Sequence, residues 1–209
     1  MGSYLALEKF FQIRAEKQKH IVNAAFMVFG KQGYRKASIA DIAKEAGTTK
    51  GMITYYFGSK KTLYLFLVET INSSLIQTVK ERLAPNITDF FERMRIVADI
   101  QVTAIKEYPA LISFVNSTYY EKDPEVAEDL KQITTVDNAE LVRMLMDETS
   151  SSSSRFKPQF DSQMIRKFTH WAAIGFMEEL CDNYCADKVD KMAAQFYVCL
   201  DTMRKAFYK

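Results

Sequence analysis

The sequence predicts an all-α fold, and three observations lead to this prediction. The 209 residues include only seven Gly and four Pro, whereas an all-β fold needs a turn signal about every 8–12 residues. Apolar residues recur at spacings of three and four along most of the chain, which is the period of an amphipathic helix. The hydrophobic set makes up 48% of the residues, which provides ample apolar mass for a core. We expect an N-terminal three-helix domain over residues 1–63 and a C-terminal helical bundle over residues 64–209.

The first two helices are expected near the N-terminus. Apolar residues in the range 15–31 fall on one stripe, and Gly33 follows as a stop. Ser38 offers an N-cap for a short second helix, which Gly47 closes. This part of the sequence therefore predicts a long helix, a turn and a short helix.

A third short helix and a long fourth helix follow. Ile53 and Phe57 are spaced to face inward on the short helix, before a glycine interrupts it. Ser59 can cap the long helix, and Pro85 ends it because proline has no N–H to continue the hydrogen-bond ladder. We expect this helix, at about residues 59–83, to connect the two parts of the chain.

Five further helices are expected in the C-terminal bundle, at about residues 88–108, 109–120, 124–146, 161–183 and 187–207. The last two are long and amphipathic. They can pair with a second copy of themselves into a four-helix bundle or cover the chain's own core, and the pattern fits both equally. The candidate dimer-interface residues are Ala172, Gly175, Phe176, Phe196, Leu200 and Met203.

Charge is distributed unevenly, although the net charge is only +2. Residues 1–85 carry 13 Lys and Arg against 6 Asp and Glu, a net of +7, and residues 86–209 carry 15 against 20, a net of −5. A basic N-terminal part joined to an acidic body indicates that the N-terminal part meets a polyanion.

The sequence also indicates where in the cell the protein is located. No apolar run approaches the ~18 residues of a membrane span, and the N-terminus lacks the pattern of a secretory signal. Cys181, Cys185 and Cys199 are odd in number and lie in helical patterns, which favours free thiols over disulfides. We therefore expect a cytoplasmic protein that has no membrane partner.

Residues 38–60 have the layout of a helix-turn-helix, because a tight turn at Gly47 separates two short helices. The second short helix is polar on the side away from Ile53 and Phe57. Hydroxyl groups and a cation on the polar side can reach phosphates and base edges, while the inward pair fixes the angle of the helix. A recognition helix for DNA needs this arrangement.

The same region resembles the TetR-type transcriptional repressors. The resemblance covers about residues 15–65 without gaps, and it rests on Ala25, Phe29, Gly33, Tyr34, Ala37, Ser38, Ile39, Ile42, Ala43, Ala46, Gly47, Thr48, Thr49, Gly51, Ile53, Tyr56, Phe57, Ser59, Lys60 and Leu63. Thr54 departs from the family pattern, which usually has Tyr at this position. A phosphate contact there would be shorter or absent, and Tyr55 would take over part of its role.

The resemblance implies a set of DNA-contacting residues. Ser38 would bind a phosphate at the cap of the first motif helix, and Lys50 and Met52 would reach base edges. The implied set is Ser38, Thr48, Thr49, Lys50, Gly51, Met52, Tyr55, Tyr56 and Lys60. For Lys50 and Lys60, the alternative is a solvated cation on the surface.

The resemblance further implies a homodimer joined by the last two helices. Its two heads would enter successive major grooves of a palindromic operator in double-stranded DNA, roughly 34–36 Å apart. A small effector bound in the C-terminal bundle would release the repressor from DNA, and aromatic and methionine candidates favour a largely apolar one. The candidate lining residues are Phe66, Met94, Ile105, Phe114, Tyr119, Met144, Phe168 and Trp171, and for each of them plain core is the alternative.

Two other classes of function compete with this one. An enzyme is disfavoured because the sequence has no HExxH, GxSxG or phosphate-binding glycine loop, and its two histidines, His20 and His170, lie far apart in sequence. Cys181 and Cys185 lack a third and fourth zinc ligand nearby, so neither a metal nor another cofactor is expected. The remaining alternative is a helical adaptor with a basic face that binds nucleic acid, membrane or protein without sequence preference.

Overall fold

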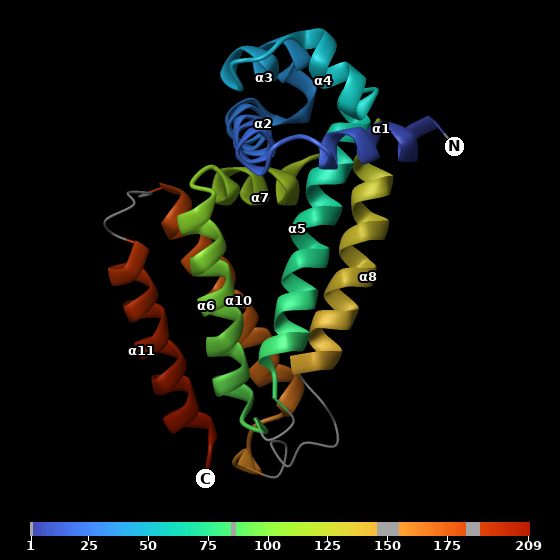
Figure 1. Cartoon of the computed structure of the whole chain (residues 1–209). Coiled ribbons are helices and arrows are strands. Elements are labelled where there is room, and N and C mark those ends of the chain that lie inside the picture. The colour runs from blue at the N-terminus through green and yellow to red at the C-terminus, as the bar shows by residue number, and fades with distance from the viewer. Residues whose placement is uncertain (1, 85–86, 146–154, 183–188) are drawn as a thin grey trace. The chain divides into compact units, whose positions relative to one another are not determined.

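The computed structural model describes residues 2–84, 87–145, 155–182 and 189–209, and the prediction of an all-α fold is confirmed (Figure 1). Within the described ranges the only strand-like pairing is an isolated bridge between Phe156 and Tyr208. None of the described helices is long and apolar enough to cross a membrane. The helices are α1 (Gly2–Phe11), α2 (Ala15–Lys36), α3 (Ile39–Glu45), α4 (Lys50–Phe57), α5 (Lys60–Arg82), α6 (Phe90–Glu107), α7 (Leu111–Tyr120), α8 (Ala127–Leu145), α10 (Ser162–Asp182) and α11 (Val189–Phe207).

The helices from α2 onward lie where the sequence predicts them, and two differences stand out. The backbone at Gly33 has φ +70° and ψ 170°, so α2 kinks there and adds one more turn instead of stopping. Helix α1 is an addition that the sequence analysis does not predict.

The chain divides into two compact units whose bounds differ from the predicted boundary at residue 63. The head unit comprises residues 1–72 and 108–135, and the body unit comprises residues 73–107 and 136–209. Helix α7 and the start of α8 therefore belong to the compact unit that holds the helix-turn-helix. The division of functions at residue 63 stays a prediction.

The head unit owes this arrangement to a close approach of α2 and α7. A Cβ atom on Gly30 would lie 2.5 Å from the Ser113 Oγ and 2.8 Å from the Phe114 backbone nitrogen, so only glycine fits at this crossing. The Glu121 carboxylate just beyond α7 accepts a hydrogen bond of 2.9 Å from the Tyr34 N–H. Helix α7 is thus held against α2 both at the crossing and beside the kink.

Aromatic rings fill the core of the head unit. The Phe29 ring meets the Tyr64 ring edge-on with centroids 4.9 Å apart, and Phe114 packs on Tyr64 at 5.4 Å. Tyr34 packs on Tyr64 at 5.0 Å. Burial raises the pKa of the hydroxyls of both Tyr34 and Tyr64. A core of interlocked rings allows few alternative arrangements of the helices around it.

In the body unit, α11 packs against α6 and α10. One core cluster, which joins these helices, includes Phe90, Ile165, Phe196 and Leu200. A second cluster joins the C-terminal half of α5 to α6 and α8 through Val79, Val97, Ile100 and Leu145. Both clusters bury apolar helix faces of the kind that the three- and four-residue spacing predicts.

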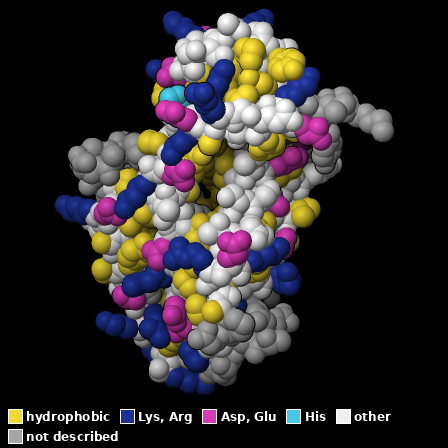
Figure 2. All heavy atoms as spheres, in the orientation of Figure 1, with side chains coloured by type: hydrophobic (Ala, Val, Ile, Leu, Met, Phe, Trp, Pro, Cys, Tyr) yellow, Lys and Arg dark blue, Asp and Glu magenta, His cyan; other side chains and the backbone are white. Residues whose placement is uncertain are grey.

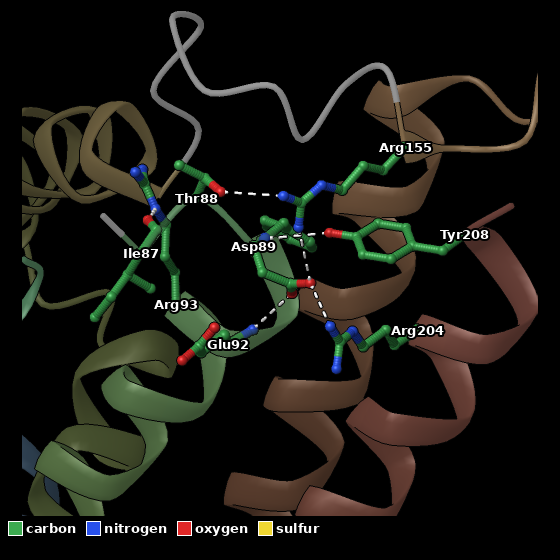
Figure 3. A network of polar contacts seen from close by, with 9 residues as sticks. Ile87, Thr88, Asp89, Glu92, Arg93, Arg155, Arg204 and Tyr208 are labelled. Atoms are coloured by element: carbon green, nitrogen blue, oxygen red, sulfur yellow. Dashed lines mark hydrogen bonds and ion pairs between the residues drawn. The ribbon is translucent and has the colours of Figure 1, made fainter. Parts of the chain in front are cut away.

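A polar network ties together one end of the body unit (Figure 3). The Asp89 carboxylate is almost fully buried, and the Arg204 guanidinium lies 2.8 Å and the Arg155 guanidinium 3.6 Å from its Oδ2. Its Oδ1 accepts a hydrogen bond from the Glu92 N–H at 3.1 Å. The Tyr208 hydroxyl accepts a hydrogen bond from the Phe90 N–H at 3.2 Å. The network joins the N-terminus of α6 to the chain end beyond α11.

The cysteine prediction is tested in part. Cys199 is free and half-buried. Cys185 and the Cys181 side chain lie outside the described residues.

Candidate DNA interface

Helix α3 begins at the cap that the sequence predicts. The Ser38 Oγ accepts a hydrogen bond from the Asp41 N–H at 3.1 Å and donates one to the Asp41 carboxylate at 2.7 Å. Gly47, at φ +62°, then makes the turn toward α4. The Ser38 hydroxyl is half-buried in this cap, so its first role is to begin the helix.

Helix α4 begins in the same way at Thr49, whose Oγ1 accepts a hydrogen bond from the Met52 N–H at 3.2 Å. Lys50, Gly51 and Tyr55 are exposed, whereas Met52 is half-buried. The first-turn N–H groups and these side chains give α4 a polar, accessible start, which is suited to phosphates and base edges. The exposed face also includes Thr54, at the position where the sequence departs from the family pattern.

The opposite face of α4 packs in the core of the head. Ile53 is fully buried and Phe57 is 1% exposed. Tyr56 is only 3% exposed and packs on Phe10 with centroids 5.9 Å apart. Tyr56 therefore holds α4 in place, and a phosphate contact by this residue stays a prediction. The half-buried Thr48 precedes the helix, in the turn that follows α3.

Lys60 contacts backbone carbonyls at the end of α2, and its expected phosphate contact stays a prediction. Its Nζ donates to the carbonyl oxygens of Tyr34 at 3.0 Å, Arg35 at 3.4 Å and Ala37 at 3.2 Å. The ammonium also lies 4.3 Å from the centroid of the Tyr34 ring. Because an ammonium has three N–H donors, these carbonyls occupy all of them. Lys60 joins the start of α5 to the end of α2, and sequence spacing could not reveal this because the contact spans 23 to 26 residues.

Sequence reasoning missed the packing of α1 against α4. The Phe10 side chain is 1% exposed and packs on Phe57 with centroids 4.8 Å apart. The Lys9 ammonium lies 4.3 Å from the centroid of the exposed Tyr55 ring on α4. The adjacent aromatic pair Phe10 and Phe11 is the signal that could have indicated a docked segment before α2.

The head carries exposed basic side chains. Lys and Arg side chains lie on the head, with Asp and Glu among them, on the face that Figure 2 shows. Lys9, Lys17, Lys44 and Lys50 are all exposed. The described residues contain no group of three or more His, Cys, Asp or Glu that could hold a metal ion.

The candidate effector-lining residues are divided between the two units. Phe66, Phe114 and Tyr119 belong to the head unit, where Phe66 packs on Phe10 and Phe57. In the body unit, Met94 and Met144 border the cluster around Val97, and Ile105 is buried. Phe168 and Trp171 are 41% and 57% exposed. The common cavity that these eight residues would line stays a prediction.

The candidate dimer residues lie mostly on the inner faces of α10 and α11. Phe196 and Leu200 are buried, and the Phe176 ring stacks on Phe196 with centroids 4.6 Å apart. Ala172 and Met203 are partly buried against the same cluster, whereas Gly175 is exposed. Phe196 and Leu200 of α11 thus cover the core of their own chain, and a dimer interface that uses the candidate residues stays a prediction.

Comparisons with known proteins agree on one family. Residues 21–66 match the family described as bacterial regulatory proteins, tetR family. The helix-turn-helix transcriptional regulator YvdT of Bacillus subtilis is 36% identical over 83 residues, which are 40% of this chain and 42% of YvdT. The helix-turn-helix transcriptional activator FasR of Mycolicibacterium smegmatis is 28% identical over 121 residues, 58% of this chain and 55% of FasR. The chain thus spans about half the length of these relatives.

Solved structures share the fold over nearly the whole chain. A TetR family transcriptional regulator from Chloroflexus aurantiacus has a TM-score of 0.69 at 19% identity, over 97% of this chain and 98% of that one. FadR from Bacillus subtilis, in complex with stearoyl-CoA, has a TM-score of 0.63 at 16% identity, over 85% of this chain and 96% of that one. The match over residues 21–66, together with the cap, turn and buried face of α4, shows that this part of the chain is a helix-turn-helix of the tetR family of bacterial regulatory proteins, and the solved structures show that the rest of the chain shares their fold.

Proposed function

We propose that this protein is a DNA-binding transcriptional regulator, a repressor that reads a palindromic operator with α4. The observation that carries the proposal is the two-sided character of α4. Its inner face is locked by Ile53 and Phe57, while Lys50, Thr54 and Tyr55 are exposed on the outer face. A rigid helix with a polar outer face can enter a major groove and present side chains to base edges.

The same proposal includes a homodimer, with an interface on the exposed face of α10. Met164, Phe168 and Trp171 are exposed apolar side chains at spacings of four and three, so they form one stripe, and Gly175 continues it. Val198 on α11 is 65% exposed. An exposed apolar stripe on a pair of long helices fits a second copy of the same pair. Gly175 is also one of the candidate dimer residues, and the stripe takes the place of the buried Phe196 and Leu200 of α11 in the proposed contact.

The dimer is tested by the charge-introducing variant Trp171→Glu. We expect it to dissociate the dimer at concentrations where the native protein is dimeric, as measured by analytical ultracentrifugation. Lys167→Glu, an exposed position on the same helix, is the control and should leave the dimer intact. A Trp171→Glu protein that remains dimeric would remove this face from the proposal.

The proposed effector is a small, largely apolar molecule taken up by the body unit. Met94, Leu141 and Met144 pack at the border of the cluster formed by α5, α6 and α8, and methionine adapts readily to apolar ligands. FadR, which shares the fold, is described in complex with stearoyl-CoA. Helix α5 begins in the head unit and ends in the body unit, so it is the proposed carrier of the response.

Release from DNA requires that the effector bind the DNA-incompetent state more tightly than the competent one. A coupling free energy of about 1–3 kcal/mol would change the affinity for DNA about 5- to 150-fold. Repression, as opposed to activation, is part of the proposal, because one relative, FasR, is named a transcriptional activator.

The experiment is the selection of bound fragments from the source genome by the purified protein, repeated at raised salt. We expect recovery of one short inverted repeat whose enrichment persists as salt rises, because base contacts survive screening better than phosphate contacts alone. Fragments without a shared motif, lost together as salt rises, would contradict the proposal and favour the non-specific adaptor.

A further inference from the structure

Helix α1 precedes the family match, which begins at residue 21, yet it is built into the head. The Phe10 ring packs on Tyr56 and Phe57 of α4 and on Phe66 of α5, with centroid distances between 4.8 and 5.9 Å. Phe10 is 1% exposed. A buried ring with contacts on two other helices anchors α1 to the head.

The turn between α1 and α2 is also fixed. The Gln18 side-chain amide donates hydrogen bonds to the carbonyl oxygens of Phe11 at 3.1 Å and Ile13 at 2.8 Å. These bonds join the first turns of α2 to the end of α1. With Phe10 anchored and the turn closed, the direction of the last turn of α1 is determined.

That last turn brings a cation to the outer face of α4. The Lys9 side chain is exposed, and its ammonium lies over the ring of Tyr55, which is 52% exposed. A cation held over an aromatic face keeps N–H donors available for other acceptors. The pair therefore presents a positioned positive charge beside a side chain of the proposed recognition helix.

We propose that α1 is a fourth helix of the DNA-contacting surface and that the Lys9 ammonium, seated on the Tyr55 ring, binds a backbone phosphate of duplex DNA. The proposal rests on the proposed function for the existence of a DNA partner. The proposed Lys9 contact lies outside the helix-turn-helix. It also gives the packing of α1 against α4 a role in DNA binding. The contact is to phosphate, so it adds affinity without sequence preference.

The test compares the native protein with Lys9→Gln on a mixed-sequence duplex of about 30 base pairs, long enough for two half-sites one turn apart. Each protomer of the proposed dimer loses one phosphate contact, so the salt slope should fall by about 1.8 per bound dimer, and the affinity advantage of the native protein should shrink roughly 12-fold between about 50 and about 200 mM salt. Lys131→Gln is the control, with the same charge change at an exposed position on α8. Its salt slope should equal the native one.

A double-mutant cycle separates a seated ammonium from a mere change of net charge. In a Tyr55→Phe background the ring remains, so Lys9→Gln should cost as much affinity as it does in the native protein. In a Tyr55→Leu background the ring is lost, and the same substitution should cost little. Equal costs in both backgrounds would overturn the pairing of Lys9 with Tyr55.

The outcomes also separate this inference from the proposed function. If the native protein binds the duplex and Lys9→Gln has the native salt slope, the Lys9 contact is overturned and the proposed function stands. If the Lys9 effect is present but no inverted repeat is preferred, sequence reading by α4 is overturned and the phosphate contact stands. If the native protein does not bind DNA at about 50 mM salt, both are overturned.

Discussion

The head unit and the body unit both bury packed aromatic rings, and they differ in that the body unit also buries charged side chains, Asp89 and Arg93. In the head, rings such as Phe29, Tyr64 and Phe114 interlock around the crossing that Gly30 permits. In the body, charged groups bridge helices far apart in sequence, as at Asp89 and Arg204 (Figure 3). Ring packing depends on shape and is indifferent to salt, whereas ion pairs are screened. The position of the proposed DNA-reading helix α4 therefore depends on the packing of aromatic rings.

The largest expected effect is in the head. Phe57→Ala removes a ring that is 1% exposed and carries contacts to Phe10 and Phe66, so it should lower the free energy of unfolding by about 3–5 kcal/mol. Chemical denaturation measures the loss. Phe11→Ala makes the same change at a ring that is 59% exposed and should cost less than about 1 kcal/mol. Equal costs would show that α4 is not held by this core.

The next effect is in the body. Asp89→Ala leaves the Arg204 and Arg155 guanidinium groups and the Glu92 N–H without their buried acceptor. Both arginines are partly exposed and can turn to solvent, so we expect a loss of about 1–2 kcal/mol, at the lower end for a lost charged partner. Denaturation at two salt concentrations measures it.

The control for that prediction is Asp201→Ala. Asp201 also pairs with an arginine, Arg95, at 3.1 Å, but its side chain is 56% exposed. The expected loss is under about 1 kcal/mol. If both variants lose the same amount, burial of Asp89 contributes nothing and the contrast between the two units weakens.

Alkaline pH should destabilise both units. Burial is the main cause that raises the pKa of Tyr197 and Tyr208 to about 12, and it also raises the pKa of the fully buried Tyr64. A folded-state pKa above the unfolded value of about 10 means that the stability contribution is complete below pH 10 and is lost as pH rises through the folded pKa.

The measurement is the free energy of unfolding at about pH 9 and about pH 11, where one such tyrosine costs at most about 1.4 kcal/mol. Tyr64→Phe and Tyr197→Phe should each remove about the same part of the pH-dependent loss, because both hydroxyls have a folded-state pKa well above about pH 11. A variant that leaves the loss unchanged would contradict the burial of that hydroxyl.

The smallest effects should be the same in both units. Lys61 pairs with Asp129 in the head and Lys106 pairs with Asp190 in the body, and all four side chains are well exposed. Lys61→Gln and Lys106→Gln should each cost at most about 1 kcal/mol, and less at high salt. A large loss for one of them in thermal unfolding would mean that surface pairs contribute to the difference between the units.

The features of the head that sequence could predict are local ones. The sequence predicts Ser38 as the start of α3, Thr49 in the polar start of α4 and Gly47 as the turn, because caps and left-handed turns depend on residue type within a few positions. The docking of Lys60 on the end of α2 depends on distant backbone carbonyls. Spacing along the chain contains no signal for such a contact.

The body shows a second limit. Helix α10 has apolar residues on two faces, with Ile165 and Phe176 packed inside and Phe168 and Trp171 exposed. Periodicity finds a helix in such a pattern but does not decide which face covers the core. This is why the predicted dimer seam and the exposed stripe fall on different residues.

The central claim is that the exposed face of α4 reads DNA sequence. The most direct test is the ratio of affinities for the selected inverted repeat and for a mixed-sequence duplex at one salt concentration. We predict a ratio of at least about 10³ for the native protein, and a ratio lower by about 5- to 150-fold for each half-site in Lys50→Ala, the equivalent of about 1–3 kcal/mol for each lost base contact. The melting temperature should not change, and Lys131→Ala should keep the native ratio. A native ratio near one, or a Lys50→Ala ratio equal to that of Lys131→Ala, would contradict sequence reading through this face of α4.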